Sequence, residues 1–507
     1  MAGSNQFSHP LNAPSSFDRA MRILKLRDPI ISQLAAAFFR EALKNNGRRR
    51  ALLLVLAPLL ALFAAAEPAA AQTPLAAAEP PAANAPPAIS GTRRAREERW
   101  AVHGQATFVL QGTPGFRSPY TGTNSFLPHQ RKETFDATLF AGVRPWSGAE
   151  VWVNPEIDQG FGLSGTLGVA GFTSGEAYKV GKKHPYPRLQ RAFFRLTINL
   201  GGATEKVEAA ANQLAGTRTA NRFVLTLGKF GVADIFDTNR YAHDPRADFF
   251  NWSLIDAGSF DYAADAWGYS TGVAGEWQQG PWTLRMGGFN LSKIPNGEKL
   301  ERGFNQYQLD AEIEHRHRLL GHDGAIRLTF FRNRGNFGRF DDALALAQAS
   351  SELPDTGLVR GRRSRIGVSF NLEQEVSGSV GMFARAGLGN GAIEPYDFSD
   401  IDRTASVGLA IDGKEWGRQG DVLGLGTVVN GISGVHQRYL NAGGIGVLVG
   451  DGRLPHPGSE VIGEAYYTWK PLTPLAVTLD YQLVVNPGYN RDRGPANVFA
   501  MRAHVQF

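Results

Sequence analysis

The C-terminal stretch 497–507, NVFAMRAHVQF, decides the fold class of this chain. Neighbouring side chains of a β-strand point to opposite faces. In an extended 497–507, one face therefore carries apolar side chains: Phe499, Met501, Ala503, Val505 and Phe507. The polar side chains on the other face are those of Arg502, His504 and Gln506. A strand with lipid on one side and water on the other has this pattern.

The same alternation recurs upstream, for example over 475–483, 306–314 and 365–373. A soluble antiparallel sheet also alternates, but each of its strands then needs an apolar partner layer. We count about sixteen such segments of about nine to thirteen residues, the length of a tilted membrane strand. They lie near 102–111, 134–144, 149–157, 189–200, 222–230, 266–278, 281–290, 305–316, 325–333, 363–374, 378–388, 403–412, 421–430, 459–469, 474–485 and 497–507.

The connections between these segments alternate in length. The short ones include 145–148, 279–280, 317–324, Ser377 and 470–471. The long ones include 112–133, 158–188, 231–265, 334–362 and 431–458. We therefore expect an all-β chain that forms a closed antiparallel transmembrane β-barrel of about sixteen strands, with short periplasmic turns and long extracellular loops. One connection, 201–221, is long where this scheme requires a short turn.

The N-terminal part predicts export. Residues 51–66, ALLLVLAPLLALFAAA, follow three arginines and precede the small residues Ala69–Ala71, which is the pattern of a signal peptide. No later segment has 18 consecutive apolar residues. We expect a cleaved signal peptide with a long basic region over 1–71, an Ala/Pro-rich periplasmic linker over 72–99, and the barrel over 100–507.

Composition excludes several kinds of chemistry. The chain has no cysteine, which excludes disulfides and thiolate sites. Its net charge is +6, but most of this excess lies in residues 1–71, so the barrel is not a basic nucleic-acid-binding protein. We expect no nucleic acid partner and no cofactor. The expected partners are outer-membrane lipid and lipopolysaccharide, with small solutes in the pore.

Several long stretches resemble the carbohydrate-selective porin family. They are HGQATFVLQGTPGFRSPYTGTNSF (103–126), NPEIDQGFGLSGTLGVAG (154–171), the stretch 212–252, the stretch 416–421, and YQLVVNPGYNRDRGPANVFAMRAHVQF (481–507). The resemblance spans about 100–507. It implies a sixteen-stranded barrel in the bacterial outer membrane, monomeric or loosely trimeric, through which sugars diffuse. The stretches 154–181 and 212–265 are also similar to manganese-uptake porins, so a high-affinity Mn²⁺ porin is an alternative.

A porin selects solutes through the charges in its lumen and through constricting loops. The alternation predicts that one set of charged side chains points inward: Glu150, Glu156, Arg191, Arg195, Arg222, Arg285, Asp310, Glu312, Glu314, Arg327, Arg365, Glu373 and Arg385. Opposed charges across a narrow pore order water and offer charge-assisted hydrogen bonds to sugars. The alternative interpretation is that these groups are only hydrated because the lumen is wet.

Loop 231–265 is the predicted constriction. It combines aromatic residues, including Trp252, with charged ones: Asp234, Asp237, Arg240, His243, Asp244, Arg246, Asp248, Asp256, Asp261 and Asp265. Aromatic faces beside carboxylates suit sugars, whereas clustered carboxylates with an imidazole suit a hard divalent cation. An ordered external loop whose aspartates cap turns is a third interpretation.

Other candidate sites are weaker. His315, His317 and His322 lie near a short turn, where a metal site is geometrically possible and a hydrated turn is the simpler interpretation. The chain contains Ser, His and Asp, but we locate no clustered acid, base and nucleophile, so an outer-membrane enzyme is only a second alternative, together with an adhesin. Residues 341–349 predict a short helix within an external loop.

Overall fold

The computed structural model describes residues 97–177 and 181–507. The signal peptide predicted for 1–71 and most of the linker predicted for 72–99 lie outside the described residues. None of the described helices is both long enough and apolar enough to cross a membrane.

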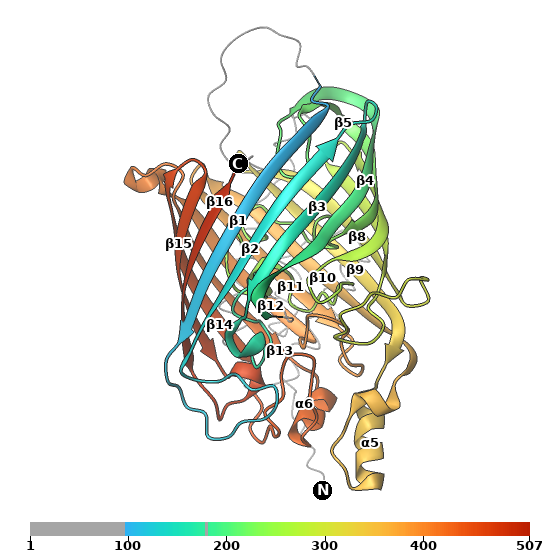
Figure 1. The fold of residues 1–507 in the computed structure, drawn as a ribbon, viewed down its shortest axis with the longest axis vertical. Coiled ribbons are helices and arrows are strands. Elements are labelled where there is room, and N and C mark those ends of the chain that lie inside the picture. Colours follow the sequence, from blue (N-terminus) through green and yellow to red (C-terminus); the bar gives the residue numbers. More distant parts are fainter. Residues whose placement is uncertain (1–96, 178–180) are drawn as a thin grey trace, which may run out of the picture. The chain divides into compact units, whose positions relative to one another are not determined.

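The described chain forms one closed barrel of sixteen antiparallel strands (Figure 1). Each strand pairs with the strands before and after it in the sequence, and β1 pairs with β16 to close the sheet. The strands are β1 (Trp100–Thr113), β2 (Gln130–Val143), β3 (Ala149–Gly160), β4 (Lys182–Val207), β5 (Gly216–Phe230), β6 (Ser270–Gln279), β7 (Trp282–Asn290), β8 (Tyr307–Leu319), β9 (His322–Phe337), β10 (Gly361–Ser377), β11 (Val380–Gly389), β12 (Arg403–Asp412), β13 (Val422–Gly431), β14 (Glu460–Leu472), β15 (Leu475–Val485) and β16 (Ala496–Gln506). The predicted closed antiparallel barrel of sixteen strands is confirmed, and each predicted segment overlaps one strand, with bounds that differ by up to several residues.

The two faces of the strands differ as the alternation predicts. Large apolar side chains are exposed on the outer face of the barrel, among them Leu139, Leu227, Met286, Leu309, Phe330, Ile366 and Leu479. The inner face carries buried polar side chains, among them Gln111, Asp136, Arg327, Asn371 and Gln482. Lipid can solvate the first set, and water or the inward-folded loops can satisfy the second.

Connections differ in length between the two ends of the barrel. At one end, the turn end, the connections are 144–148, 208–215, 280–281, 320–321, 378–379, 413–421 and 473–474. At the other, the loop end, they are 114–129, 161–181, 231–269, 291–306, 338–360, 390–402, 432–459 and 486–495. The connection predicted over 201–221 is wrong in its bounds, because β4 and β5 extend past the other strands and leave only 208–215 between them.

Short helices lie within the connections. The α-helices are α4 (Trp252–Ile255), α5 (Phe340–Ser350) and α6 (Gly434–Asn441), and the 3₁₀ turns are η1 (Leu163–Gly165), η2 (Thr356–Val359), η3 (Gly413–Trp416) and η4 (Pro487–Tyr489). α5 confirms the helix predicted over 341–349. Both α5 and α6 lie at the loop end, opposite the C-terminus (Figure 1).

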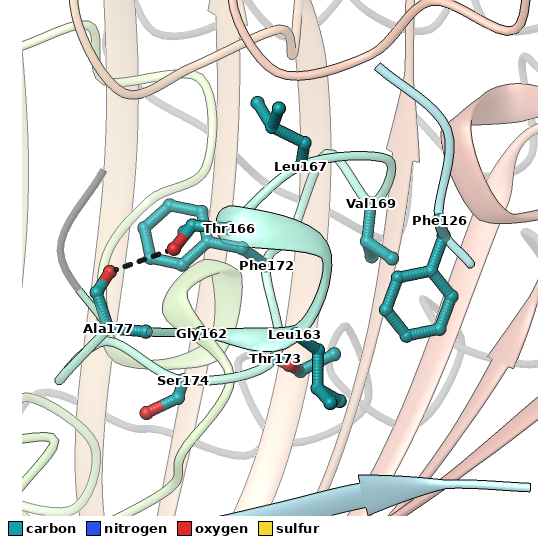
Figure 2. Close-up of a pocket in the computed structure, with 10 residues that line it drawn as sticks. All are labelled: Phe126, Gly162, Leu163, Thr166, Leu167, Val169, Phe172, Thr173, Ser174 and Ala177. Carbon is teal, nitrogen blue, oxygen red and sulfur yellow. Dashed lines mark hydrogen bonds between the residues drawn. The ribbon is translucent and has the colours of Figure 1, made fainter. Parts of the chain in front are cut away.

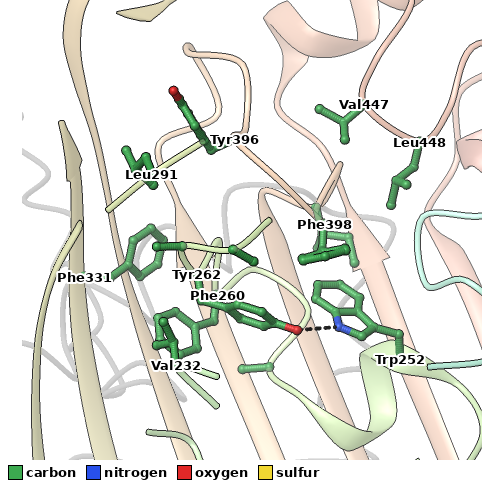
Figure 3. Packing of buried hydrophobic residues seen from close by; sticks show 14 of the residues in the cluster. Val232, Trp252, Phe260, Tyr262, Leu291, Phe331, Tyr396, Phe398, Val447 and Leu448 are labelled. Atoms are coloured by element: carbon green, nitrogen blue, oxygen red, sulfur yellow. Dashed lines mark hydrogen bonds between the residues drawn. The ribbon is translucent and has the colours of Figure 1, made fainter. Parts of the chain in front are cut away.

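Parts of three loops of the loop end pack inside the barrel. In loop 161–181, Thr166 donates from its hydroxyl to the Ala177 carbonyl, and the residues around a small pocket pack against Phe126 (Figure 2). Loops 231–269 and 390–402 meet in an aromatic cluster, where the Trp252 indole donates to the Tyr262 hydroxyl at 3.2 Å beside Phe398 (Figure 3). The hydrophobic core of this barrel is therefore built largely from loops.

Candidate solute passage

Loop 231–269 crosses the interior of the barrel. Residues 249–267 are all buried. The loop contacts inward-facing side chains of β2, β3, β11, β14 and β16, and these strands are spread around the whole cylinder. A loop can reach all of these side chains only from inside.

Ion pairs bind this loop to one side of the wall. Asp237 faces Arg385 of β11 at 3.2 Å, and Asp261 faces Arg365 of β10 at 2.9 Å. Arg385 also donates to the carbonyls of Leu254 (2.8 Å) and of a second loop residue. Because both arginine side chains are fully buried, each needs such partners to offset the loss of its hydration.

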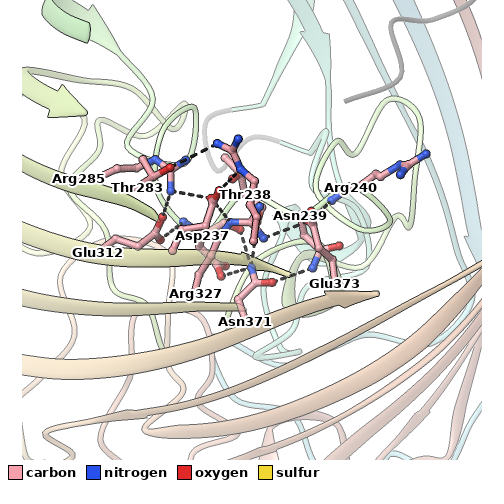
Figure 4. A network of polar contacts seen from close by, with 12 residues as sticks. Asp237, Thr238, Asn239, Arg240, Thr283, Arg285, Glu312, Arg327, Asn371 and Glu373 are labelled. Carbon is pink, nitrogen blue, oxygen red and sulfur yellow. Dashed lines mark hydrogen bonds and ion pairs between the residues drawn. The ribbon is translucent and has the colours of Figure 1, made fainter. Parts of the chain in front are cut away.

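A polar network continues from Asp237 along the wall (Figure 4). Its backbone N–H donates to Glu312 of β8 at 2.8 Å, and Glu312 also accepts from Arg285 of β7 at 2.7 Å. Asn371 of β10 donates to the Asp237 carboxylate at 2.6 Å. Further along the loop, the backbone N–H of Arg240 donates to a β10 carboxylate at 2.8 Å. The loop therefore replaces water as the partner of these inward-facing groups.

Arg246 binds the loop to the opposite wall. Its guanidinium lies 3.4 Å from Asp136 of β2, 3.5 Å from Glu156 of β3 and 3.2 Å from Glu176 of loop 161–181. Burial raises the pKa of Glu176 well above its ordinary value, and Asp136 reinforces this shift against the opposing effect of Arg246. One cation thus joins three acidic groups from three segments.

Two backbone N–H groups complete the attachment. Those of Phe250 and Asn251 donate to the two carboxylate oxygens of Glu464 on β14, at 2.6 and 2.9 Å. Arg502 of β16 donates to the carbonyls of Pro245 and Asp248 at 2.5 and 3.0 Å.

Two cavities remain beside the loop. The first, of about 300 Å³, is lined by aromatic and charged side chains that include Phe172, Glu176, Arg191, Asp234, His243, Arg246, Trp252, Asp256, Tyr262, Trp267, Tyr269 and Phe398. The second, of about 290 Å³, lies toward the turn end and includes Arg144, Glu150, Arg195, Arg218, Arg222, Asp234, Glu276, Arg285 and Arg316.

Asp234 lines both cavities, and its carboxylate pairs with Arg191 of β4, which lines the first. The pair is bidentate, with Nε–Oδ2 and Nη2–Oδ1 distances of 2.8 and 2.5 Å. The guanidinium carbon of Arg191 also lies 4.8 Å from the ring centre of Tyr269. Burial alone would raise the pKa of Asp234, but the facing guanidinium outweighs it and holds this pKa below its ordinary value. The pair therefore places a fixed positive and negative charge where the cavities meet.

A family model matches most of the chain. The model of the carbohydrate-selective porins, the OprB family, matches residues 125–507. The chain belongs to this family. No curated protein matches the chain.

The chain is similar to solved structures of other outer-membrane channels, and the first of them shows the same fold. High-pH Pseudomonas putida OprB has 15% sequence identity and a TM-score of 0.61, and the match covers 81% of this chain and 94% of that one. For the low-pH structure of the same protein, the identity is 12%, the TM-score 0.44 and the coverage 81% and 93%. For the channel DcaP of Acinetobacter baumannii, these values are 11%, 0.42, and 80% and 97%. The chain is an outer-membrane diffusion porin by family and fold.

The structure divides the predicted pore-lining residues of this porin into two groups. Glu150, Arg195, Arg222 and Arg285 line the second cavity, and Arg191 lines the first. The others are buried and line neither cavity: Glu156, Asp310, Glu312, Arg365 and Arg385. Inward-folded loops and neighbouring strands cover these five side chains, and all but Asp310 have hydrogen-bond or ion-pair partners there. Their pore-lining role stays a prediction.

Asp310 differs from the rest of this group. Among the described residues, neither of its carboxylate oxygens has a hydrogen-bond partner. Three other inward-facing side chains, Glu314, Arg327 and Glu373, form a chain of ion pairs, with Arg327 at 2.9 Å from Glu314 and 3.0 Å from Glu373.

The predicted constriction residues of loop 231–265 also fall into two groups. The side chains that line the first cavity are those of Asp234, His243, Asp244, Arg246, Trp252 and Asp256. The others bind the wall or the loop itself: Asp237 and Asp261 face arginines, Asp265 faces Arg188 and Lys229, Asp248 accepts from the backbone at 243 and 244, and Arg240 faces Glu375. Burial raises the pKa of Asp256 to about 6, although His243, at 3.8 Å, acts in the opposite direction.

The loop carboxylates are therefore not gathered into one metal site. Asp256, Asp261 and Asp265 each have separate partners: Tyr262, Arg365, and the pair Arg188 and Lys229. The described part of the chain contains no group of three or more His, Cys, Asp or Glu placed to hold a metal ion. Manganese uptake stays a prediction.

The three histidines near the β8–β9 turn lie apart from the passage. The His315 ring packs on Trp282, with ring centres 4.3 Å apart. His317 pairs with Gln374 at 2.9 Å, and His322 lies 3.5 Å from Glu375.

Sequence reasoning missed several residues of the first cavity. The strand predicted from 266 begins at Ser270, so Trp267 and Tyr269 belong to the loop. Glu176 and Phe398 come from loops 161–181 and 390–402, to which no pore role was given. The aromatic residues of 390–402 were the available signal, since exposed loops rarely concentrate them.

Proposed function

We propose that carbohydrates cross this porin through the two cavities and pass the Arg191–Asp234 pair. The observation that carries this proposal is that Asp234 lines both cavities. The family supplies the solute class, since its description is carbohydrate-selective.

The first cavity suits a sugar chemically. A sugar ring has apolar faces and a rim of hydroxyl groups. Trp267 and Tyr269 supply aromatic surface, and Arg191 and Asp234 supply a donor and an acceptor with full charge. Charge-assisted hydrogen bonds are about twice as strong as neutral ones, so hydroxyls can replace the water that they lose. Apolar solutes lack this compensation.

The second cavity is rich in arginine, with Arg144, Arg195, Arg218, Arg222 and Arg285 among its lining residues. Several of them face acids, such as Arg195 with Glu150 at 3.8 Å. Guanidinium groups present several fixed donors to hydroxyl oxygens. We infer that the sugar leaves one set of hydrogen bonds as it forms the next, which is what passive diffusion through a narrow pore requires.

The test is sugar block of ionic current in planar bilayers. The reconstituted porin is expected to conduct, and added neutral sugar is expected to reduce that current in a saturable way. Trp267→Ala should weaken the block several-fold, because it removes aromatic surface from the first cavity. Trp277→Ala is the matched control, since Trp277 lies on β6 and is exposed on the outer face.

Conductance that no sugar reduces would contradict the carbohydrate proposal while leaving the diffusion porin intact. Block by micromolar Mn²⁺ in place of sugar would favour the metal alternative.

A further inference from the structure

Two arginines of β9 and one of β10 differ from the arginines inside the barrel. Arg332, Arg334 and Arg362 share the outer face of their strands with the exposed residues Phe330 and Ile366, so they point toward the membrane side. Inward-facing arginines such as Arg327 and Arg365 each face carboxylates. Within the described ranges, none of the three outer arginines has a carboxylate within 4.0 Å.

The strand register places the three side chains together. β8, β9 and β10 are consecutive neighbours in the barrel (Figure 1). Arg334 lies opposite Ser364, and Arg332 lies opposite Ile366. Arg362 lies opposite Asn336, one same-face position beyond Arg334. Arg334 and Arg362 are therefore diagonal neighbours, about 7 to 8 Å apart, and Arg332 is the next same-face residue to Arg334 on β9. The three form a row with Arg334 in the middle, which a headgroup-sized ligand can span.

Ser364 draws two of these cations to one point. Its hydroxyl oxygen lies 3.4 Å from Nε of Arg332 and 3.4 Å from Nη1 of Arg334. Two like charges held around one small acceptor repel each other unless an anion lies between them. An external anion would satisfy both.

The cluster lies directly above the apolar belt. Arg332 has Leu309 and Ile366 as its cross-strand partners, and Phe330 is the next same-face residue toward the turn end. These three side chains are 49%, 57% and 49% exposed, respectively. The level of the arginines is thus the level of lipid headgroups, and acyl chains would cover the residues below.

We propose that Arg332, Arg334 and Arg362 form a binding site for the phosphorylated headgroup of lipopolysaccharide. β9 and β10 are joined by the long connection 338–360, so the cluster lies at the loop end, which faces the outer leaflet in barrels of this kind. That leaflet is built from a lipid with phosphates on a disaccharide. Arginine binds phosphate through parallel N–H groups, and Tyr307, opposite Arg334, adds an aromatic side chain beside the sugar.

The test measures lipid binding by native mass spectrometry. Porin refolded without lipopolysaccharide is titrated with bisphosphorylated lipid A, dephosphorylated lipid A and phosphatidylglycerol. The wild type is expected to bind the bisphosphorylated lipid most tightly. Each basic residue near an anionic surface contributes about a fivefold gain, so the triple variant R332Q/R334Q/R362Q should bind about a hundredfold more weakly.

The matched control is K206Q/R318Q/R438Q. It removes the same charge from three exposed residues, each of which already faces a carboxylate: Glu208, Asp323 and Asp341. Its lipid A affinity should equal that of the wild type. Ser364→Ala keeps every charge and should weaken binding only a few-fold, which keeps the test open if the triple variant folds poorly.

Three results would overturn the proposal. The triple variant and the control could bind lipid A with equal affinity, or the wild type could bind phosphatidylglycerol as tightly as lipid A. The spectra could also show that the wild type and the control are dimers and that only the triple variant is a monomer. Sugar block of the current should be unchanged in the triple variant. A failure of this site is therefore distinguishable from a failure of the proposed carbohydrate path.

Discussion

At the scale of single residues, the charged side chains inside the barrel differ in how much of their surface is accessible. Arg385 and Arg365 are fully buried and bind a loop, whereas Arg191 and Asp234 keep 17% and 32% of their side-chain surface accessible. The alternation predicted that the three arginines point inward, and the composition of loop 231–265 made Asp234 a candidate. What distinguishes them is whether a loop covers them.

Arg191→Gln is expected to change ion selectivity. It leaves Asp234 without its guanidinium partner at the meeting point of the cavities. A unit charge in a water-filled site interacts with an ion about 4 Å away by about 1 kcal/mol, so the permeability ratio should shift toward cations by roughly fivefold. Reversal potentials in a salt gradient measure this ratio. Arg318→Gln, at an exposed turn, is the control and should leave the ratio unchanged.

At the scale of elements, loop 231–269 acts as an internal partition held by opposite walls. Asp237 and Asp261 connect it to β10 and β11, and Arg246 connects it to β2 and β3 on the opposite wall. Because the anchors are buried ion pairs and hydrogen bonds, losing one member leaves an uncompensated charge.

Arg385→Met is expected to loosen this partition. Breaking a buried pair by removing one partner costs about 3 to 5 kcal/mol, and the loop carbonyls of Ala242 and Leu254 also lose a donor. Single-channel recordings should show larger and noisier currents. Arg131→Met, on the exposed outer face of β2, should behave as the wild type.

The double variant Arg385→Met/Asp237→Asn should recover part of the lost stability, since it removes the orphaned carboxylate as well. If the double variant loses as much stability as the two single variants together, Arg385 and Asp237 are not energetically coupled.

At the scale of the whole molecule, the barrel depends on its seam. β1 and β16 close the sheet, and the backbone groups of Gly104 and Phe507 exchange hydrogen bonds of 3.0 and 2.9 Å. The Phe507 ring lies over Gly104, where a Cβ would be 2.5 Å from Cζ of the ring. A side chain at this position would displace the terminal ring from the seam.

Gly104→Leu is therefore expected to weaken closure. Overpacking of this kind costs about 1 to 3 kcal/mol, so the temperature at which the folded band is lost on semi-native gels should fall. Gly463→Leu is the matched control, because Gly463 lies on β14 and has open space around its Cβ position. An equal fall in both variants would show a general cost of replacing strand glycines.

The sequence by itself determined the barrel. Lipid and water favour different side chains, so a period of two in β16 or β8 predicts a strand and its faces, and counting such segments along the chain predicts the number of strands. The inward direction of Arg191, Arg365 and Arg385 follows from the same rule.

Only the tertiary structure decided which inward-facing charges line the two cavities and which ones the loops cover. Local alternation says which face a side chain is on, but not what a distant loop places against it. Asp261 meets Arg365 and Asp237 meets Arg385 across more than a hundred residues of sequence, and these contacts convert expected pore charges into buried anchors. The passage is the space that remains after loops 161–181, 231–269 and 390–402 have packed, and such packing has no period that a sequence can display.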